Sequence, residues 1–331
     1  MNILDNLKKI NLKAVCVFLI GLALVFQLCG MIISPKGYSA NDIVGTTSVL
    51  NRLKKEKDNS FDVLFAGDSC MTYGISPLQI WGDYGYKTYN LSYQAAKICD
   101  TYAVIQEVLK TQKPKVIVLD CDSLFLDGRV YQTEDQILNS VEQVFSVFHY
   151  HTVYKLMAPS VSFIGKKVYS DQLFKGFRIK SGTVAYTGGK YMKDNSDGSH
   201  RNHDKAEEMG TDSESYLNAI YKLCTDNNIQ MLLVNVPAPN LWNQEKHETV
   251  QSWADQYHID YVDMNLADDQ IGLDWNTDTA DGGGHLNLSG SKKVTAYLAK
   301  YLQNKYSLSV DAENEEWKAA YNRAAVYGEK S

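Results

Sequence analysis

The stretch FDVLFAGDSC, residues 61–70, contains the pattern that decides the fold. Its first part is a short apolar run interrupted only by Asp62, which is typical of a strand buried in a parallel sheet. Gly67 ends the run, and Asp68 and Ser69 follow directly. Because open α/β sheets bind ligands at the carboxyl ends of their strands, this run predicts a serine placed where a nucleophile is needed. A tight turn whose serine caps a helix is the alternative for the tripeptide alone.

Four further apolar runs are bounded by turn residues in the same way. They are KTYNLSY at 87–93, PKVIVLD at 114–120, IQMLLVNVP at 229–237 and IDYVDM at 259–264. Helical patterns alternate with them at residues 95–111, 214–226 and 289–306. This alternation predicts a doubly wound, flavodoxin-like α/β fold, with a parallel sheet of about five strands and helices on both faces.

An apolar segment, AVCVFLIGLALVFQLCGMII at residues 14–33, precedes the strands. Roughly 20 apolar residues match the thickness of a bilayer core, and Gln27 is the only strongly polar side chain among them. Three lysines precede the segment, whereas only Lys36 follows closely. The positive-inside rule therefore predicts a single-pass anchor in the cell membrane, with a cytoplasmic N-terminus and an extracytoplasmic catalytic part. A cleaved signal peptide is the alternative, although no A-x-A site follows the segment.

These features predict how the chain is organised. The predicted parts are a cytoplasmic N-terminus at 1–13, a transmembrane anchor at 14–34, a juxtamembrane linker at 35–60, a catalytic domain at 61–306 and a tail at 307–331. Residues 123–212 are rich in Tyr, Phe, Gly and His and lack the strand and helix rhythm. We interpret them as an insertion over the active-site end of the sheet, with a surface loop bundle as the alternative.

Composition argues against two classes of function. The net charge of -6 and the pI near 5.7 disfavour a nucleic-acid-binding surface, which needs clustered lysine and arginine. The six cysteines include no CxxC pair and no Cys/His spacing suited to zinc. The sequence therefore predicts no metal site and no cofactor.

A second loop complements the serine. The sequence DGGGHLN at 281–287 precedes the last predicted helix, and a histidine on such a glycine-rich loop can reach a neighbouring strand end. Ser69 and His285 both map to the carboxyl edge of the sheet, as a Ser/His/Asp site requires. Asp281 and Asp278 are both candidates for the acid. We favour Asp281, because its glycine spacer can curl the carboxylate back to the imidazole ring.

The order of these motifs resembles the SGNH/GDSL hydrolase superfamily over most of residues 61–306. Within it, the anchor and the strings FAGDSCMTYGISPLQIW, TYNLSYQAA and HLNLSGSKKVT are most similar to the branch of the D-alanyl transfer protein DltD and alginate-type O-acetyltransferases. In that branch a membrane-bound O-acyltransferase passes acyl groups outward to the SGNH protein, which loads a polymer. The resemblance therefore implies such an acyltransferase partner and a cell-envelope glycan or teichoic-acid-like acceptor.

The resemblance also implies roles for individual residues. Ser69 matches the nucleophile, and its own N–H would donate to the oxyanion. The second motif matches Asn90 through Ala95, which would place Asn90 on the oxyanion and substrate side of the site and make the Ala95 N–H another donor. The third motif departs from the pattern, because Asp122 occupies the place of the oxyanion asparagine. Since losing one oxyanion donor costs about 3 kcal/mol, Asp122 is expected to be protonated or turned elsewhere.

Three interpretations of function stay open at this point. The first is acyl transfer to an envelope polymer through an acyl-Ser69 intermediate, with His285 as the base. The second is hydrolytic deacylation of the same class of polymer. The third is an inactive, anchored polymer-binding module, which the Asp122 substitution and the D-x-x-x-H spacing would suit, since the superfamily usually has D-x-x-H. A hydrogen bond between Ser69 and His285 would favour an enzyme.

Overall fold

The computed structural model describes residues 11–33, 46–126, 174–188, 207–210 and 212–328, together with Val141, Val144, Phe145, Val147 and Phe148. The chain divides into two compact units, Met1–Ile43 with Tyr131–Tyr169 and Val44–Val130 with Ser170–Ser331. The second unit contains the sheet and every residue predicted for the site. Most of the predicted insertion at 123–212 lies outside the described residues.

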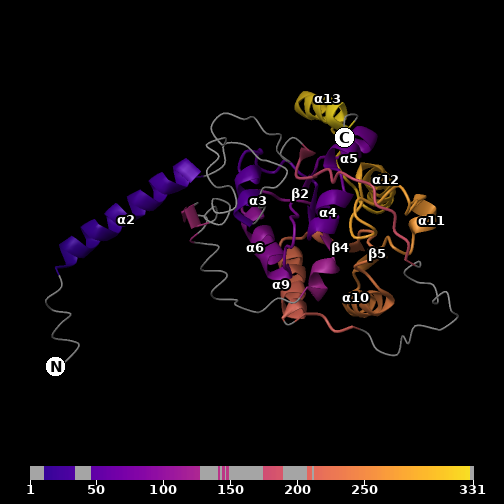
Figure 1. Cartoon of the computed structure of the whole chain (residues 1–331), viewed down its shortest axis with the longest axis horizontal. Helices are drawn as coiled ribbons and strands as arrows, with labels where there is room; N and C mark the ends of the chain where they lie inside the picture. Colours follow the sequence, from indigo (N-terminus) through magenta and orange to yellow (C-terminus); the bar gives the residue numbers. More distant parts are fainter. Residues whose placement is uncertain are drawn as a thin grey trace. The chain divides into compact units, whose positions relative to one another are not determined.

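Five parallel strands form the sheet (Figure 1). They are β1 (Val63–Ala66), β2 (Thr88–Asn90), β3 (Val116–Asp120), β4 (Gln230–Asn235) and β5 (Asp260–Asp263). Their order is β2-β1-β3-β4-β5, in which Val63 pairs with both Thr88 and Val116. This is the flavodoxin-like order, so the predicted fold class and the predicted five-stranded parallel sheet are confirmed.

Both faces of the three central strands are buried, which explains why β1, β3 and β4 are largely apolar. Leu64, Ile117 and Leu233 point into the hydrophobic cluster on one face. Their neighbours along the strands, among them Val63 and Val118, point into the cluster on the other face. Successive side chains of a strand alternate between the two faces of the sheet. When both faces are covered, both sets of side chains are buried, which favours apolar residues in both.

Helices cover the two faces in separate layers (Figure 1). One face packs against α3 (Thr46–Leu53), α6 (Ile98–Val108), α9 (Ser213–Asp226) and α10 (Gln244–Tyr257), and the other against α4 (Ser69–Gly74) and α12 (Leu288–Lys305). The remaining helices are α5 (Pro77–Tyr84), the 3-10 turn η1 (Asp122–Phe125), α11 (Asp268–Ile271) and α13 (Glu315–Gly328). The helices predicted at 95–111, 214–226 and 289–306 correspond to α6, α9 and α12.

Helix α13 shows that the C-terminal segment takes part in the core. Trp317 is buried, and its ring lies 6.3 Å from that of Trp81 on α5. The ring of Tyr321 also packs on Trp81, at 6.0 Å. This helix therefore stabilises α5 and, through it, the segment that follows Ser69.

The first unit contains α2 (Leu12–Ile33), a helix of 22 residues. At about 1.5 Å per residue it is long enough to cross a bilayer core. Its segment Lys13–Gly30 has a mean hydropathy of 2.1, and by length and composition this helix is suited to a membrane span. Gln27 donates a hydrogen bond from its side-chain nitrogen to the Val144 carbonyl, at 2.8 Å. A partner of this kind lowers the cost of placing an amide side chain in an apolar phase.

Candidate active site

The turn after β1 delivers Ser69 to the carboxyl edge of the sheet. Gly67 has φ 151°, and a Cβ at this position would lie 2.7 Å from Asp120 Cβ, so the turn requires glycine. Asp68 then caps α4 by accepting a hydrogen bond from the Cys70 N–H, at 2.8 Å. Ser69 is the first residue of α4 and is half-buried. The helix cap predicted as the alternative is thus provided by Asp68, which leaves the Ser69 hydroxyl available.

The structure brings Ser69, His285 and Asp281 together in a continuous chain of hydrogen bonds. His285 Nε2 lies 2.8 Å from Ser69 Oγ, and His285 Nδ1 lies 2.6 Å from Asp281 Oδ2. The backbone N–H of His285 also donates to Asp281 Oδ1, at 2.8 Å. Both carboxylate oxygens of Asp281 are therefore used to hold the histidine.

Glycines between Asp281 and His285 accommodate the long spacing. Gly282 and Gly283 have φ values of 80° and 91°, so the chain curls back on itself between the acid and the base. The Ala280 N–H donates to the His285 carbonyl at 2.9 Å, which closes the loop. The extra residue of the D-x-x-x-H spacing is therefore absorbed locally.

Asp278, the alternative acid, is placed differently. Its carboxylate lies 2.6 Å from Lys293 Nζ on α12 and accepts a hydrogen bond from the Asp274 N–H. Its side chain is almost completely buried, with 1% exposed. The contacts of Asp278 thus tie the loop to α12, whereas Asp281 contacts the imidazole.

The environment of Asp281 favours its ionised form. Burial opposes ionisation, but hydrogen bonds from His285 and Lys180 outweigh this effect and hold the pKa of Asp281 below its ordinary value. An ionised carboxylate at this position is what a Ser/His/Asp site needs in order to orient the imidazole.

Two side chains that the sequence analysis did not single out complete the surroundings of the histidine. The Tyr73 ring packs edge-on against His285, with ring centroids 5.4 Å apart. Lys180 Nζ lies 3.0 Å from Asp281 Oδ2 and 5.1 Å from the centroid of the Tyr73 ring. Gln94, beside Ala95, donates a hydrogen bond to the Tyr73 hydroxyl. The exposed turn at Ala95, where φ is 54°, therefore borders the site.

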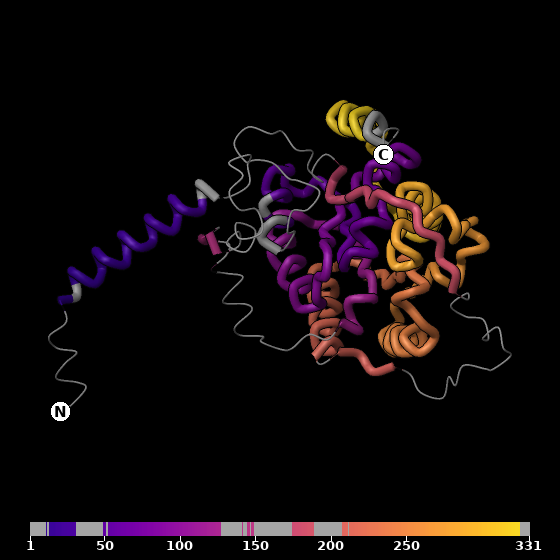
Figure 2. The backbone as a smooth tube through the Cα atoms, viewed as in Figure 1, coloured from indigo at the N-terminus to yellow at the C-terminus, as the bar shows by residue number. Residues whose placement is uncertain are grey.

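Lys180 belongs to an extended segment, residues 174–188, which we call the strap. The Asn90 N–H donates to the Lys175 carbonyl at 2.9 Å, and the Arg178 N–H donates to the Thr72 carbonyl at 3.0 Å. Further along, the Gly282 N–H donates to the Val184 carbonyl at 3.0 Å. Figure 2 shows the strap as a pink tube that crosses from the purple elements around α4 to the orange loop before α12. The strap thus connects the serine side of the site with the histidine side.

Asn90 has a structural position that the resemblance did not imply. Its side-chain nitrogen donates to the carbonyls of Met71 and Ile75, at 2.9 and 3.1 Å. Its side-chain oxygen accepts hydrogen bonds from Ser92. Both amide protons are used in this way, so Asn90 holds α4 against the loop after β2 and does not offer a donor to an oxyanion.

Asp122 belongs to a cluster of buried acids that includes Asp68, the residue before Ser69. It is hydrogen-bonded to Asp68, and Asp120 lies close to both. Burial raises the pKa of all three carboxyl groups, and mutual repulsion raises those of Asp68 and Asp120 further. The hydrogen bond between the two carboxyl groups raises the pKa of Asp68 and lowers that of Asp122. The protonated carboxyl group of Asp68 is therefore the donor, and Asp122 is the acceptor.

The same cluster brings together groups that are able to ligate a metal. Ligand atoms of Asp68, Cys70 and Asp122 lie within 4.8 Å of one another. Burial raises the pKa of the Cys70 thiol, and the neighbouring carboxylates raise it further.

These raised pKa values predict that the free energy of unfolding decreases as pH rises. The folded state binds protons more tightly than the unfolded chain, whose carboxyl groups titrate near ~4. The stabilisation is complete below that pH and is lost as pH rises through the higher folded-state values.

We expect the melting temperature of the full-length protein in detergent to fall between pH 5 and pH 8, and Asp120→Asn to reduce that fall. Asp83→Asn, on the exposed side of α5, is the matched control. Equal pH dependence in all three proteins would contradict an acid cluster that holds protons.

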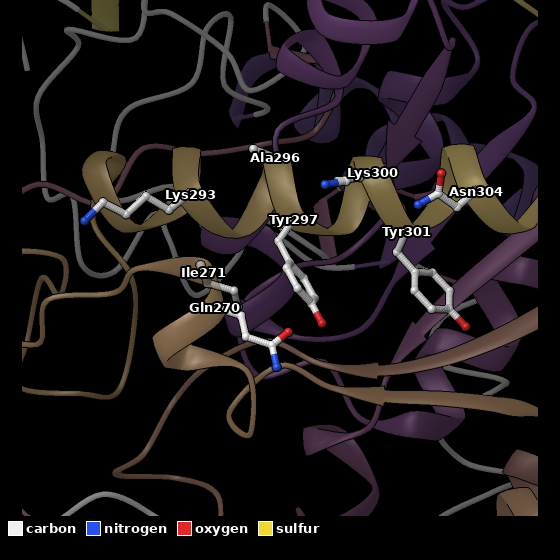
Figure 3. A pocket seen from close by; sticks show the side chains of 8 residues that line it. All are labelled: Gln270, Ile271, Lys293, Ala296, Tyr297, Lys300, Tyr301 and Asn304. Atoms are coloured by element: carbon white, nitrogen blue, oxygen red, sulfur yellow. The ribbon is translucent and has the colours of Figure 1, made fainter.

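An open groove of about 720 Å³ lies along α12, apart from the triad (Figure 3). Tyr297 projects from α12 toward Gln270, Tyr301 lies further along the helix, and Lys300 is exposed. Ser69, His285 and Asp281 do not line this groove.

Comparisons with known proteins concern the fold. No protein-family model matches the sequence, and no curated protein matches it. A GDSL-like lipase from Bacteroides thetaiotaomicron is similar in structure, with 10% identity, a TM-score of 0.39, and coverage of 79% of this chain and 100% of that one. A family 3 carbohydrate esterase from Clostridium thermocellum has 14% identity, a TM-score of 0.36, and coverage of 75% of this chain and 96% of that one. These likenesses are too distant to assign an activity, which must come from the residues of this chain.

Proposed function

We propose that this chain is an SGNH-type serine acyltransferase, anchored in the cell membrane with its active site outside the cytoplasm. The single observation that carries the proposal is the chain of hydrogen bonds from Ser69 through His285 to Asp281. A nucleophile within hydrogen-bond reach of a base, which a carboxylate orients in turn, is the arrangement that acyl transfer needs.

The reaction follows from this arrangement. Asp281 accepts a hydrogen bond from His285 Nδ1–H, which leaves Nε2 free to take the proton of the Ser69 hydroxyl. Ser69 Oγ attacks the carbonyl carbon of an ester, and the protonated histidine gives its proton to the leaving group. In the second half, His285 removes a proton from the acceptor hydroxyl, whose oxygen attacks the acyl carbon. The bond to Ser69 Oγ breaks, and the protonated histidine returns the proton to that oxygen, which regenerates the free serine.

The N–H groups of Ser69 and Ala95 are the proposed donors to the oxyanion. Neither N–H group has a partner within the described part of the chain. Asp122 would disfavour a negative oxygen if it were ionised. Burial and the proton shared with Asp68 support a cluster with reduced negative charge, which makes Asp122 compatible with the reaction.

The preference for transfer over hydrolysis rests on the anchor. We propose that α2 spans the membrane with the N-terminus inside, so that cytosolic acyl donors cannot reach Ser69. A multi-spanning, membrane-bound O-acyltransferase would then supply the acyl group, and a cell-envelope glycan or teichoic-acid-like polymer would receive it. Deacylation of such a polymer remains the second enzyme function for the same site. The intact hydrogen-bond chain favours both over an inactive binding module.

Cellular acylation tests the transfer step. In cells that carry such an O-acyltransferase, we expect polymer acylation with the full-length chain and none with Ser69→Ala. A secreted form without residues 1–34, and cells that lack the O-acyltransferase, should both show the background level. The readout is the content of ester-linked acyl groups on purified polymer. Full acylation by the secreted form in cells without the O-acyltransferase would overturn the relay and leave a self-sufficient enzyme.

A further inference from the structure

The triad acid has a second partner, which lies outside the three residues of the triad. Lys180 Nζ approaches Asp281 Oδ2 at 3.0 Å, and this is the same oxygen that lies 2.6 Å from His285 Nδ1. The carboxylate oxygen is therefore shared between an ammonium group and an imidazole. We propose that Lys180 is a positioning residue that fixes the Asp281 carboxylate and restrains the basicity of His285. This inference rests on the proposed function only in so far as His285 acts as the base.

The electrostatic argument is direct. A carboxylate favours the protonated form of a neighbouring imidazole, because the two opposite charges attract. A lysine on the same oxygen offsets part of that attraction and repels the imidazolium itself. With Lys180 in place, His285 should therefore lose its proton at a lower pH than it would beside Asp281 alone.

The surroundings of Lys180 distinguish it from an ordinary surface ion pair, which contributes little because two long side chains must be ordered in water. The side chain of Lys180 is only 28% exposed, and its ammonium lies over the Tyr73 ring. The strap is fixed on both sides of it, by the hydrogen bonds of Arg178 with Thr72 and of Val184 with Gly282. These contacts restrict the conformations of the Lys180 side chain, so little further ordering is needed to form the ion pair.

Other charged or titratable groups around the histidine act in the opposite direction or through other residues. The Asp122 carboxyl interacts electrostatically with His285, and Lys246 acts in turn on Asp122. The Cys70 thiol contacts the carbonyl of Gly284 at 3.7 Å, and burial keeps it protonated. The phenol of Tyr73 is held by Gln94. Among the described residues, Lys180 is the cation that contacts the triad acid.

The test compares Lys180→Met with Lys180→Arg in the full-length protein in detergent. Lys300→Met is the matched control, because it removes a lysine that is exposed on α12 (Figure 3). The first readout is the rate of Ser69 labelling by a fluorophosphonate between pH 4.5 and 9. We expect Lys180→Met to move the midpoint of the acid limb upward by about half a pH unit or more. Lys180→Arg should restore the wild-type midpoint, and Lys300→Met should leave it unchanged.

A second readout does not depend on activity. Histidines labelled with ¹³C at Cε1 can be titrated by NMR, and the His285 signal can be identified by its loss in His285→Gln. We expect the His285 signal to titrate at a higher pH in Lys180→Met than in the wild type. An unchanged midpoint in this titration would overturn the role of Lys180, whatever the labelling shows. If the wild type is not labelled at Ser69 but the His285 titration still shifts, the proposed function fails and the influence of Lys180 stands.

Discussion

Replacing Ser69 with alanine is expected to abolish the acyl-enzyme and reduce turnover of activated esters by on the order of 10⁵- to 10⁶-fold. The reason is that, among the described residues, Ser69 Oγ is the only hydroxyl hydrogen-bonded to the His285 imidazole ring. Intact-mass measurement after incubation with a fluorophosphonate gives the readout, with one adduct in the wild type and none in the variant. Ser289→Ala, which removes an exposed serine at the start of α12, is the matched control and should be labelled normally.

The fold should tolerate this change. The Ser69 side chain is half-buried, and α4 keeps its cap because Asp68 provides it. We expect a melting temperature close to that of the wild type, since removing one hydroxyl outside the core changes stability little. An adduct that persists in a folded Ser69→Ala protein would remove Ser69 from the mechanism.

The second large effect separates the two candidate acids. Asp281→Asn should reduce the rate by up to about 10⁴-fold, because an asparagine cannot hold the histidine in the tautomer that accepts the serine proton. Asp278→Asn should leave the rate near that of the wild type. It should instead lower the melting temperature, because Asp278 is buried and its partner Lys293 would lose its counter-charge. Ester hydrolysis and thermal unfolding of both variants give the comparison.

The two variants are expected to have opposite effects on rate and on melting temperature, so each serves as the control for the other. Asp281 is partly exposed, so its loss should affect rate more than stability, whereas Asp278 should do the reverse. Near-normal rates in both variants would contradict a triad and leave Ser69 and His285 as a dyad. A large rate loss in a stable Asp278→Asn protein would assign the acid to Asp278.

The sheet was predictable because its physics is local to each strand. Burial on both faces favours apolar residues in the central strands, and turn residues bound each run. Each of the five predicted runs contains an observed strand. Helix α10 is harder to find, because Val250, Trp253 and Ala254 are its buried residues and the rest of the helix is polar. A helix that buries so narrow a stripe leaves only a weak periodic signal.

The geometry of the site was predictable where chain order fixes it. Ser69 and the Asp281 to His285 loop follow from strand ends and glycine spacing, and the structure brings them together. Lys180 carries no such signal, because it lies on an extended segment whose neighbours are set by distant backbone hydrogen bonds. Asn90 shows a different limit of sequence motifs. The motif identifies the residue as an asparagine, but it does not reveal that the Met71 and Ile75 carbonyls accept both protons of its side-chain amide.

The distance between Ser69 and His285 along the chain, 216 positions, has a consequence for biosynthesis. Chains emerge from the ribosome with the N-terminus first, and contacts between distant segments form late in folding. The serine and its strand are made early, whereas the acid and the base sit on one loop and arrive together, just ahead of α12. A chain arrested before residue 281 would contain all five strands and a chemically silent serine, so a nascent chain beside other esters of the membrane would not react with them.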